Sequence, residues 1–576
     1  MAKNISKTKL ILILILFIAA FLRLWRLSSV PVSLFGDEVD VGYQAYSILK
    51  TGRDYYGNFM PIHFHSLAEW RTPLYLYSAV PTVAVFGISP LGVRLPAAIF
   101  GILGVYIFYL LIKQITNHQS LITVASFLLA ISPWHIQYSR AGFEVTLLLL
   151  LLLLGLYFFF KSLPGRQAGK FIILSSVCFV LTPWVYSTAK LFTPLLMLFL
   201  FFVWRKEIFT IPKRYTLYAF ATLFIVGGPI VWSTLFGGGA QRFDYIGIFT
   251  DPTMESEVGT ERLNDARARG EKGTGLNPTF IDRAIHNKFT FVGNNLLRNY
   301  LKPFSFDFLF NNGDPNPRHS INKMGEFFKI EALALILGLI LFFSSKNLDK
   351  KIKALIAFWI LAGVIPASLT RDGGNHATRL ILILPPLIFL ISFGWVETYR
   401  LISKKYKYIY LLGTGSLYVL CIFFYLHNYW VHNPTYSERW WHYGFKEGIT
   451  YIKDNQQSYD KVIISTANEP PWIFFAGLYK YDPKLWQKNF PIGNDIELAG
   501  VGKVSHIDKF YFGSPSGGVY DWGKVVDDKI LYLASAKEVN VNLIMEPERT
   551  PGDLTLLMAI PFPSGEPAYY LFTGKK

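Results

Sequence analysis

The sequence has few cysteines and few charged residues. Only two of its 576 residues are cysteine, Cys178 and Cys421, and both lie in apolar runs. Two cysteines so far apart give no disulfide framework and no cysteine-based metal motif. Charged residues make up 16% of the chain, whereas a soluble protein has about 25%. The shortage of charge therefore argues against a soluble globular protein.

Apolar residues are abundant and are gathered into long runs. Hydrophobic residues make up 52% of the chain, and the mean hydropathy is +0.32. The runs are about 17–22 residues long, the length that an α-helix needs to cross a bilayer. The N-terminal run lacks a small-residue cleavage site, so we expect a retained helix and not a cleaved signal peptide. The sequence predicts an α-helical polytopic membrane protein.

Basic residues exceed acidic ones by 17, because the chain has 56 Lys and Arg against 39 Asp and Glu. The excess is concentrated in loops between apolar runs, so it predicts membrane orientation and no nucleic-acid partner. Such loops face the cytoplasm in most membrane proteins. The clusters lie at 3–9, 161–170, 205–214, 346–353 and 399–408.

With these clusters inside, about eleven membrane-spanning helices are expected. They fall near 8–26, 91–112, 120–138, 142–160, 171–187, 189–204, 215–236, 328–344, 352–369, 378–397 and 408–427. This odd number places the N-terminus in the cytoplasm and the C-terminus outside, in a multi-pass protein of the cell membrane. The short run 72–87 contains Pro73 and Pro81 and is expected to lie along the outer leaflet. If it crosses, the count becomes twelve or thirteen.

This topology divides the chain into two expected domains. Residues 1–430 form a transmembrane module whose outer loops are 27–90 and 237–327. Residues 431–576 form a small extracellular α/β domain, because short strand-like runs at 461–466, 509–513, 529–535 and 554–561 alternate with polar loops. Within 237–327, the segment 265–275 is either a lid over a site or a disordered loop.

An acid pair, Asp37 and Glu38, directly follows the first expected span. Residues 41–51 have helical periodicity and Gly52 is a stop signal, so an amphipathic helix is expected at the surface. One interpretation is that Asp37 caps this helix. The other is that it acts on a bound substrate.

Basic residues at the same membrane level favour the second interpretation. A single interfacial arginine often only extends toward the headgroups. A group of arginines beside an ionised acid instead indicates an anionic substrate, and a lipid-linked phosphosugar is the natural candidate at a membrane surface. The group comprises Arg71, Arg94, Arg140 and Arg379.

Two further segments allow two interpretations each. In 132–145, Arg140 and Glu144 are four residues apart, and they form either an ion pair on one helix face or a cavity wall. In 438–452, the letters WWHYG resemble the WWDYG signature of oligosaccharyltransferases, with His442 in place of its aspartate. We interpret this segment as the amphipathic first helix of the C-terminal domain.

Two stretches of the sequence resemble a known family: GDEVDVGYQAYSILKTGRDYYG and EWRTPLYLYSAVPTVAVFGISPLGVRLPAAIFG. They are similar to the polyprenyl-phosphate-sugar-dependent glycosyltransferases of the protein O-mannosyltransferase and aminoarabinose-transferase type, glycosyltransferase family 39. The matching parts are the acid pair, the basic residue before Pro-Leu-Tyr, and Val-Arg-Leu-Pro. The resemblance is clearest over 20–190 and implies a GT-C fold.

The resemblance also implies an activity: inverting transfer of a sugar from a polyprenyl-phosphate donor to an acceptor hydroxyl. It makes Asp37 the general base and Glu38 a residue that holds or tunes the site. Arg71 would contact the donor phosphate, and Arg94 matches an arginine at the top of the second helix. Expected phosphate contacts are Arg71, Arg94, Arg140 and Arg379. Candidate substrate contacts are Glu69, Arg318, His319 and His376.

No cofactor is expected, because arginines can supply the charge that a phosphate leaving group needs. A divalent metal ion is the alternative, held by Asp37 with His63, His65 or His376. The expected partners are the lipid-linked donor, membrane lipids, and an acceptor that is a protein, a glycan or a lipid.

Two other functions use similar residues. A flippase for a lipid-linked sugar also needs basic groups, but distributes them along a path through the bilayer. Here the expected spans are nearly free of charge, and the ionisable groups gather at their outer ends, which favours the enzyme. An oligosaccharide ligase differs only in donor and acceptor and stays open.

Overall fold

The structure, a computed structural model, describes residues 7–67, 69–163, 169–239, 241–273, 276–346, 348–489 and 496–575. Its chain forms two compact units. The bundle unit comprises Met1–Ile18, Leu103–His135 and Leu147–Val419. The loop–tail unit comprises Ala19–Ile102, Ile136–Thr146 and Leu420–Lys576.

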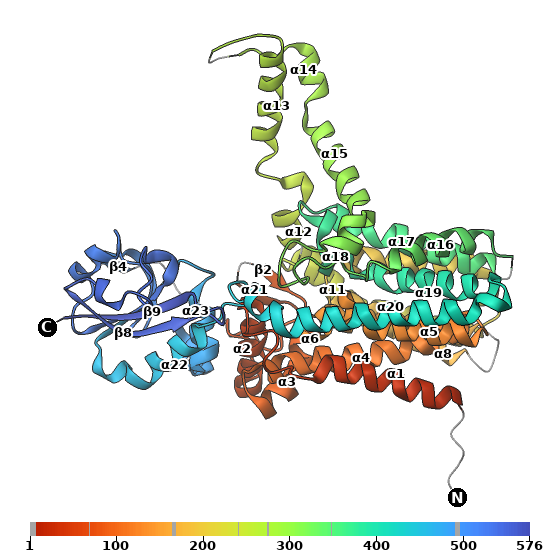
Figure 1. Cartoon of the computed structure of the whole chain (residues 1–576), viewed down its shortest axis with the longest axis horizontal. Coiled ribbons are helices and arrows are strands. Elements are labelled where there is room, and N and C mark those ends of the chain that lie inside the picture. Colours follow the sequence, from red (N-terminus) through yellow and green to blue (C-terminus); the bar gives the residue numbers. More distant parts are fainter. Residues whose placement is uncertain are drawn as a thin grey trace, which may run out of the picture. The chain divides into compact units, whose positions relative to one another are not determined.

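In the described residues, a helix lies at each position where a span is expected (Figure 1). These helices are α1 (Lys7–Leu24), α4 (Pro90–Ile115), α5 (Gln119–Ile131), α7 (Val145–Ser162), α8 (Lys170–Leu181), α9 (Ala189–Val203), α11 (Lys213–Phe236), α16 (Glu331–Ser344), α17 (Lys350–Ser368), α19 (Leu384–Leu401) and α20 (Lys407–His427). Six helical segments are long and apolar enough to cross a membrane, or seven if the bent pair α5–α6 is one span. The helical membrane fold is confirmed, and the count of eleven spans stays a prediction.

The expected span 120–138 is broken. It consists of α5 and a short helix, α6 (Pro133–Arg140), whose axes differ by 50°. The break falls at Ser132, whose ψ of 124° is outside the helical range. Proline sterically disfavours a helical conformation in the residue before it, so Pro133 explains why α5 ends there.

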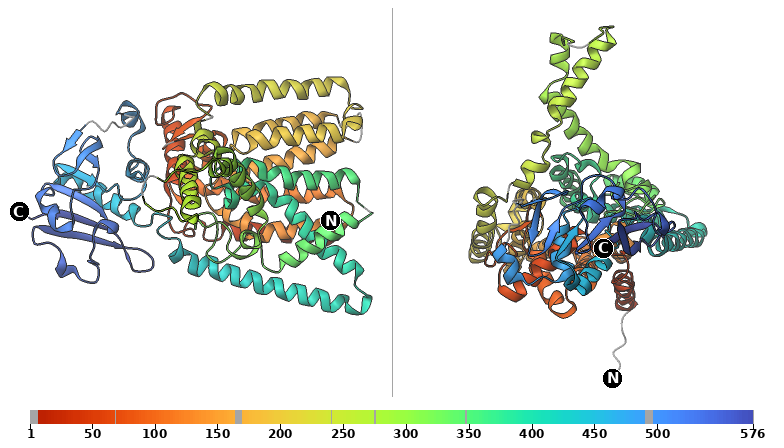
Figure 2. Two further views of the ribbon diagram at one scale, coloured as in Figure 1. Left: turned by 90° about the horizontal axis from the view of Figure 1, so that it is seen from above. Right: turned by 90° about the vertical axis from the view of Figure 1, so that its left-hand side faces the viewer.

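Within the bundle unit, the expected outer loop 237–327 is largely helical. Its elements include α12 (Gln241–Ile246), α13 (Met254–Ala268), α14 (Phe280–Ile285) and α15 (Lys288–Leu301). Helices α13 to α15 form a hairpin that stands out from the other helices of this unit (Figures 1 and 2). Residues 265–268 of the expected lid belong to α13, and 274–275 lie outside the described residues. A lid role stays a prediction.

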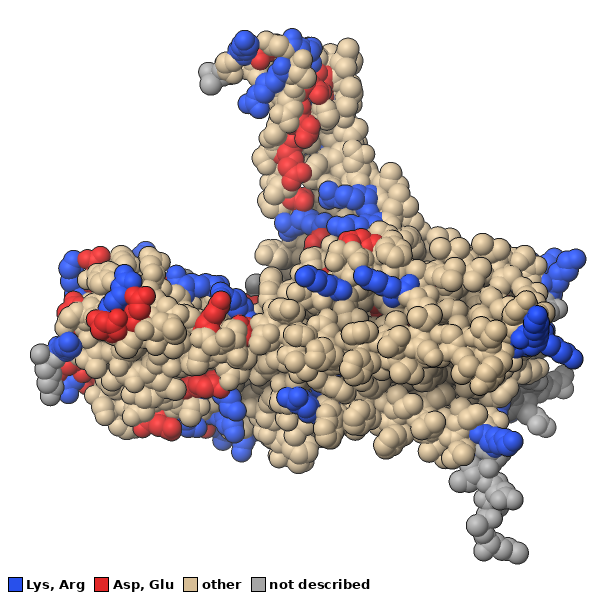
Figure 3. Space-filling model, viewed as in Figure 1, with Lys and Arg blue, Asp and Glu red and all other residues tan. Residues whose placement is uncertain are grey.

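Charge on the bundle unit is concentrated at helix ends. On the face drawn in Figure 3, the flanks of the helices carry few charged groups, and Lys and Arg gather at the right-hand ends. The sequence places basic clusters at 346–353 and 399–408, between α16 and α17 and between α19 and α20. Uncharged flanks with charged ends suit helices that lie in lipid.

The expected first outer loop, residues 27–90, contains helices and a small β-hairpin. Its elements are α2 (Gly36–Thr51), β1 (Phe64–Ser66), β2 (Glu69–Arg71) and α3 (Leu74–Phe86). The predicted helix after the acid pair is confirmed. It ends at Gly52, whose φ of 69° lets its N–H reach the Ile48 carbonyl. Helix α3 is short, as expected for 72–87, and its place at the outer leaflet stays a prediction.

Helix α2 is not the surface helix that its amphipathic pattern predicts. Ten of its 16 residues are buried. Helix α3 packs against it, and so does α23 (Pro471–Tyr479) of the C-terminal region. The polar side of α2 is therefore covered, and the acids on it need partners inside the protein.

The C-terminal region is an α/β domain, as predicted. A seven-stranded sheet has the order β4-β5-β6-β3-β7-β9-β8, in which β3 is parallel to β6 and β7. The strands are β3 (Lys461–Ile464), β4 (Ile496–Leu498), β5 (Gly502–Ile507), β6 (Phe510–Phe512), β7 (Ile530–Ser535), β8 (Leu554–Pro561) and β9 (Pro567–Gly574). Helices α21 (Asn433–Tyr436), α22 (Phe445–Asn455) and α24 (Pro483–Asn489) accompany them. The four expected strands are present, while β4, β5 and β9 were not expected.

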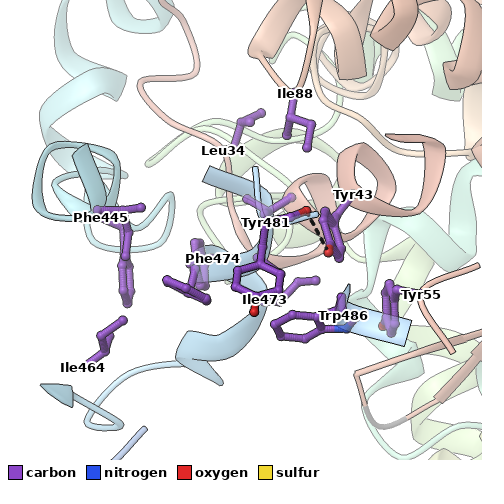
Figure 4. Close-up of a cluster of buried hydrophobic side chains, with 14 of the residues drawn as sticks. Leu34, Tyr43, Tyr55, Ile88, Phe445, Ile464, Ile473, Phe474, Tyr481 and Trp486 are labelled. Carbon is purple, nitrogen blue, oxygen red and sulfur yellow. Dashed lines mark hydrogen bonds between the residues drawn. The ribbon is translucent and has the colours of Figure 1, made fainter. Parts of the chain in front are cut away.

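One hydrophobic core joins the first outer loop to this domain. Tyr43 of α2 packs with Trp486 and Tyr481, and its hydroxyl donates to the Tyr481 carbonyl over 3.2 Å (Figure 4). Side chains of α22, α23 and one face of the sheet complete the cluster. The loop and the tail therefore form one unit, which differs from the expected boundary near residue 430.

Candidate functional site: the carboxylates and arginines around α2

Asp37 and Glu38 lie in the first turn of α2. The residue before the helix, Phe35, is its N-cap, and no side chain caps the helix. Asp37 therefore does not have the capping role considered from the sequence, although its charge suits the helix dipole. The two acids differ in environment, because Asp37 is half-buried and Glu38 is fully buried.

Glu38 is held by Arg94 of α4 in a buried two-pronged ion pair. Arg94 donates from Nε and Nη2 to the two carboxylate oxygens, each over 2.7 Å. Its Nη groups also donate to the carbonyls of Leu27, Pro31 and Ser33. These bonds use all five N–H groups of the guanidinium. Arg94 thus has no N–H group left for a phosphate in this structure.

Two more groups enclose this ion pair. The backbone N–H of Gly142 donates to Glu38 Oε1 over 2.7 Å. The indole of Trp441 faces the Arg94 guanidinium at 5.2 Å, a cation–π distance. A Cβ at Gly142 would lie 3.1 Å from Glu38 Cγ and 2.8 Å from a Val93 methyl, so glycine allows this close approach.

A second arginine, Arg71 at the end of β2, lies between two carboxylates. Its Nη1 is 3.3 Å from Asp40 Oδ2 and donates to the Asp37 carbonyl, also over 3.3 Å. Its Nη2 is 3.4 Å from Glu144 Oε2. The family resemblance points to Arg71 as a phosphate contact, and the structure places it beside the backbone of Asp37.

Asp40 is completely buried and accepts hydrogen bonds from Tyr55 and Ser66 over 2.9 and 2.7 Å. Burial raises the pKa of Asp40 to about 6, although Arg71 and the two hydroxyls act in the opposite direction. A carboxyl that titrates near this pH can change the charge beside Arg71 within the physiological range.

Asp37 is the exception among these acids. No hydrogen bond or ion pair joins its carboxylate to any other described residue, whereas Glu38, Asp40 and Glu144 each contact an arginine. Its side chain is also the most accessible of the four. The arrangement leaves one carboxylate able to receive a proton from a bound molecule.

Arg140 is buried at the end of α6. It donates to the carbonyls of Leu22 and Val30, each over 2.9 Å, and to the Tyr429 hydroxyl over 3.2 Å. Its predicted ion pair with Glu144 is wrong, because α6 ends at Arg140, the two residues do not share a helix, and Glu144 pairs with Arg71. The bonds of Arg140 instead tie α6 to the chain around the first loop.

The remaining predicted residues lie in the bundle unit. Arg379 of α18 (Ala377–Leu380) is buried and bonds to Thr370 Oγ1 over 2.8 Å and to Asp372. It is thus held by its own loop. The phosphate contact predicted for Arg379 stays a prediction.

Asp314, His319 and His376 form a second cluster in this unit, and their ligand atoms lie within 4.8 Å of one another. This residue set fits a divalent ion such as zinc. However, Asp314 already accepts N–H bonds from Asn316 and Ala377 over 2.9 and 2.8 Å. Burial raises the pKa of Asp314 to about 7.

Burial lowers the pKa of His319 well below its usual value, and nearby His376 and Arg318 act in the same direction. A low pKa keeps the imidazole neutral, which is the form that binds a metal ion. Among the described residues, Asp37, His63 and His65 belong to no such group of three ligands. A metal ion held by Asp37 stays a prediction. The side chain of Glu69 lies outside the described part of β2.

Sequence analysis missed three residues of the α2 network: Asp40, Trp441 and Tyr429. Asp40 is the third acid of the GDEVD stretch, two positions after Glu38. Tyr429 and Trp441 lie about 390 to 400 positions after the acids, and the WWHYG letters were the only signal for Trp441. Their contacts with Arg94 and Arg140 come from the tail's packing on the first loop.

Comparisons with known proteins find one matching family model and several similar folds. The family model for dolichyl-phosphate-mannose-protein mannosyltransferase matches residues 71–232. The structure resembles ArnT from Cupriavidus metallidurans bound to undecaprenyl phosphate, at 10% identity over 97% of both chains, with a TM-score of 0.50. No curated protein sequence matches this chain.

Two further structures are similar over part of their length. The archaeal oligosaccharyltransferase AglB from Archaeoglobus fulgidus matches at 13% identity and TM-score 0.49, over 82% of this chain and 64% of AglB. This chain therefore spans less than two thirds of AglB. The S. cerevisiae Pmt1–Pmt2 O-mannosyltransferase complex matches at 19% identity and TM-score 0.31, over 40% of this chain and 33% of that one.

The fold defines a class: a polytopic membrane protein of the GT-C type. Within that class, the predicted resemblance to the protein O-mannosyltransferase type is confirmed, and the family match lies over 71–232. The match begins at Arg71 and includes Arg94, Arg140 and Glu144. Family and fold together support glycosyl transfer in general.

Proposed function

We propose that this chain is an inverting glycosyltransferase. It moves a sugar from a polyprenyl-phosphate donor to an acceptor hydroxyl on the outer face of the cell membrane. The observation that carries the proposal is the environment of Asp37. This half-buried carboxylate makes no hydrogen bond or ion pair with the described residues, while the acids around it are paired with arginines.

In the proposed step, Asp37 accepts the proton of the acceptor hydroxyl. The hydroxyl oxygen attacks the anomeric carbon of the donor sugar from the face opposite the phosphate. The bond between that carbon and the phosphate oxygen breaks, and polyprenyl phosphate leaves with the bonding electrons. One such displacement inverts the anomeric configuration and needs no covalent intermediate.

The arginines have two different roles in this proposal. Arg71, which contacts the Asp37 carbonyl, stabilises the negative charge that develops on the leaving phosphate. Arg94 and Arg140 are positioning residues, because their N–H groups are bonded to Glu38 or to backbone carbonyls. Glu38 holds the start of α2 and takes no part in proton transfer.

Arg318, His319, His376 and Arg379 remain proposed contacts for donor or acceptor, and eleven spans with the N-terminus inside remain the proposed topology. Cysteine accessibility tests both points together. In a background without Cys178 and Cys421, single cysteines at position 37 and at position 372, an exposed site in the loop of Arg379, are expected to react with an impermeant maleimide added outside intact cells. Labelling of the two positions from opposite sides would exclude a common site.

No metal is required in the proposed mechanism, because arginine supplies the charge beside the phosphate. Treatment with EDTA is expected to leave the transfer rate unchanged. If activity falls and zinc or manganese restores it, the test continues with His319→Gln. A metal response that this variant abolishes would reassign the Asp314, His319 and His376 cluster as a functional metal site.

The decisive experiment compares wild type with Asp37→Asn in proteoliposomes that contain polyprenyl-phosphate sugars. Asparagine has nearly the same shape but cannot accept the proton, so kcat should fall by about 10²–10⁴-fold while donor binding is kept. The matched control is Asp54→Asn, because Asp54 lies in the same loop and its carboxylate accepts hydrogen bonds from nearby Asn58. Full activity of Asp37→Asn would refute the proposal.

A further inference from the structure

One cavity of the C-terminal domain is lined by none of the residues of the arginine network. Its volume is about 340 Å³, within the range of small-molecule sites, about 300–1,000 Å³. It is lined by the segment before α22, the ends of β3 and β7, and the hairpin between β8 and β9. All of these elements belong to the loop–tail unit.

The cavity lies where the sheet topology favours a ligand site. Strands β3 and β7 are parallel neighbours, and Asn468 and Ser535 line the cavity where these strands end. After β3 the chain enters α23, which packs on one face of the sheet. After β7 it runs to Val539 and Leu543, which pack on the opposite face. Connections that diverge in this way open a crevice at the carboxyl ends of the strands.

The cavity wall offers hydrogen-bonding groups of both kinds. The Asn468 amide donates to Ser535 Oγ over 3.3 Å and to the Tyr569 hydroxyl over 3.0 Å. The Tyr569 hydroxyl thus accepts one bond and keeps its own proton to donate. Asn542 uses its carbonyl oxygen for the N–H groups of Ile544 and Met545, which leaves its amide N–H groups to donate.

Most charges in the cavity wall are paired. Arg439 pairs with Glu566, and His442 lies 3.2 Å from Glu469. Lys537 also lines the cavity, but its side chain is exposed to solvent. Arg439 also lies over the ring of Phe562 at 5.4 Å. A cavity with neutral amide and hydroxyl groups, an aromatic side chain and paired charges suits a neutral polyol better than an anion.

The backbone at His442 is held in an uncommon conformation. Its φ is 47°, in the left-handed region that side-chain-bearing residues seldom adopt. Such strain persists where the surrounding structure fixes it, and it is concentrated at binding sites. Here it directs the chain so that Trp441 contacts Arg94 while His442 lines the cavity.

A chain of contacts leads from the cavity to the acid pair. His442 contacts Glu469, and the Glu469 carboxylate lies so close to Gly36 that a Cβ there would clash with it. Gly36 directly precedes Asp37. Only glycine allows the Glu469 carboxylate to approach the start of α2 this closely.

From these observations, we propose that the cavity binds a neutral saccharide unit of the acceptor. Asn468, Asn542 and Tyr569 exchange hydrogen bonds with its hydroxyls, and Phe562 provides an apolar surface. Saccharide binding itself does not depend on the proposed transferase activity. The assignment of that saccharide to the acceptor rests on it.

Binding can be measured without turnover in the full-length Asp37→Asn protein in detergent. Saturation-transfer NMR would be recorded with neutral gluco- and manno-oligosaccharides, with a uronic-acid oligosaccharide of equal length, and with a Ser/Thr-rich peptide. We expect a saturation-transfer signal, which reports binding, from a neutral saccharide. Tyr569→Phe, which keeps the ring packed on Phe445, should weaken that binding about tenfold, since one hydrogen bond is lost. The control, Tyr511→Phe in β6, should bind as the parent does.

The outcomes separate this proposal from the proposed activity. Binding of only the acidic saccharide or only the peptide would overturn it, and so would equal binding by Tyr569→Phe and its parent. If wild type transfers sugar but binds no neutral saccharide, the cavity assignment fails and the enzyme stands. If saccharide binds but no donor is ever used, the enzyme assignment fails and the binding site stands.

Discussion

Arg94 and Arg71 belong to the same network, but their contacts with carboxylates differ in length. Arg94 is 0% exposed, and its Nε and Nη2 each lie 2.7 Å from a carboxylate oxygen of Glu38. Arg71 is 5% exposed, and its contacts with Asp40 and Glu144 are 3.3 and 3.4 Å long. Sequence alone gives both arginines the same role, a phosphate contact.

This difference separates a structural ion pair from a group suited to a ligand. A buried guanidinium with every N–H donated fixes the chain around it and cannot exchange partners without leaving a buried carboxylate unpaired. A guanidinium that bridges two acids through longer contacts can turn toward a third anion at lower cost. On this basis we propose that Arg94 fixes the position of α2 and that Arg71 contacts the donor.

The largest expected effect comes from breaking the Arg94 pair. Arg94→Met leaves Glu38 buried without its counter-charge, which should destabilise the protein by about 3–5 kcal/mol. The measurement is the midpoint of thermal unfolding, followed by tryptophan fluorescence in detergent. Adding Glu38→Gln to Arg94→Met should recover part of the loss, because the unpaired charge is then removed. A wild-type midpoint for Arg94→Met would contradict the structural role.

A smaller effect on a different observable is expected for Arg71→Lys. Lysine keeps the charge but cannot bridge two acceptors and a phosphate with one planar group. We expect kcat/KM for the donor to fall about 100-fold, about 2.7 kcal/mol of transition-state stabilisation, with an unfolding midpoint close to wild type. The control is Arg53→Lys, an exposed arginine of the same loop. A large loss of stability without a kinetic defect would make Arg71 a second structural residue.

The sequence was informative where a local signal decides the structure. Apolar runs located the helices, and Gly52 marked the end of α2, because helix length and the left-handed C-cap are set by neighbouring residues. The strands β3, β6, β7 and β8 were found for the same reason. The break at Ser132 had a local cause in Pro133, which the apolar run concealed.

The sequence was uninformative where distant segments meet. Nothing near Glu38 reveals that Arg94 and Gly142 enclose it, or that Trp441 covers the guanidinium. The periodicity of α2 predicted a surface helix. In the structure α3 and α23 pack on α2, so its polar residues form an internal network. The four-residue spacing suggested an ion pair between Arg140 and Glu144. Helix α6 ends at Arg140, however, and Glu144 pairs with Arg71. Such contacts depend on tertiary packing and not on local propensity.

The smallest expected effect concerns the second acid beside Arg71, Asp40, and it appears as a pH dependence. The pKa of Asp40 is raised to about 6 in the folded protein, against about 3.9 in an unfolded chain. The folded state therefore favours the protonated carboxyl. The stability that this group contributes is complete below about pH 4 and is lost as pH rises through about 6.

Asp40→Asn removes this titration and keeps a neutral side chain of the same shape. The unfolding midpoint of the variant, taken relative to wild type, should therefore rise between pH 4 and pH 7, the range that contains both pKa values. Asp460→Asn, a change of an exposed acid in the same unit, should show no such trend. If Arg71 instead held Asp40 ionised throughout, the sign would reverse, with wild type gaining stability over the variant as pH rises. Arg71 would then resemble Arg94 as a tightly paired residue, and its assignment as the donor contact would fail.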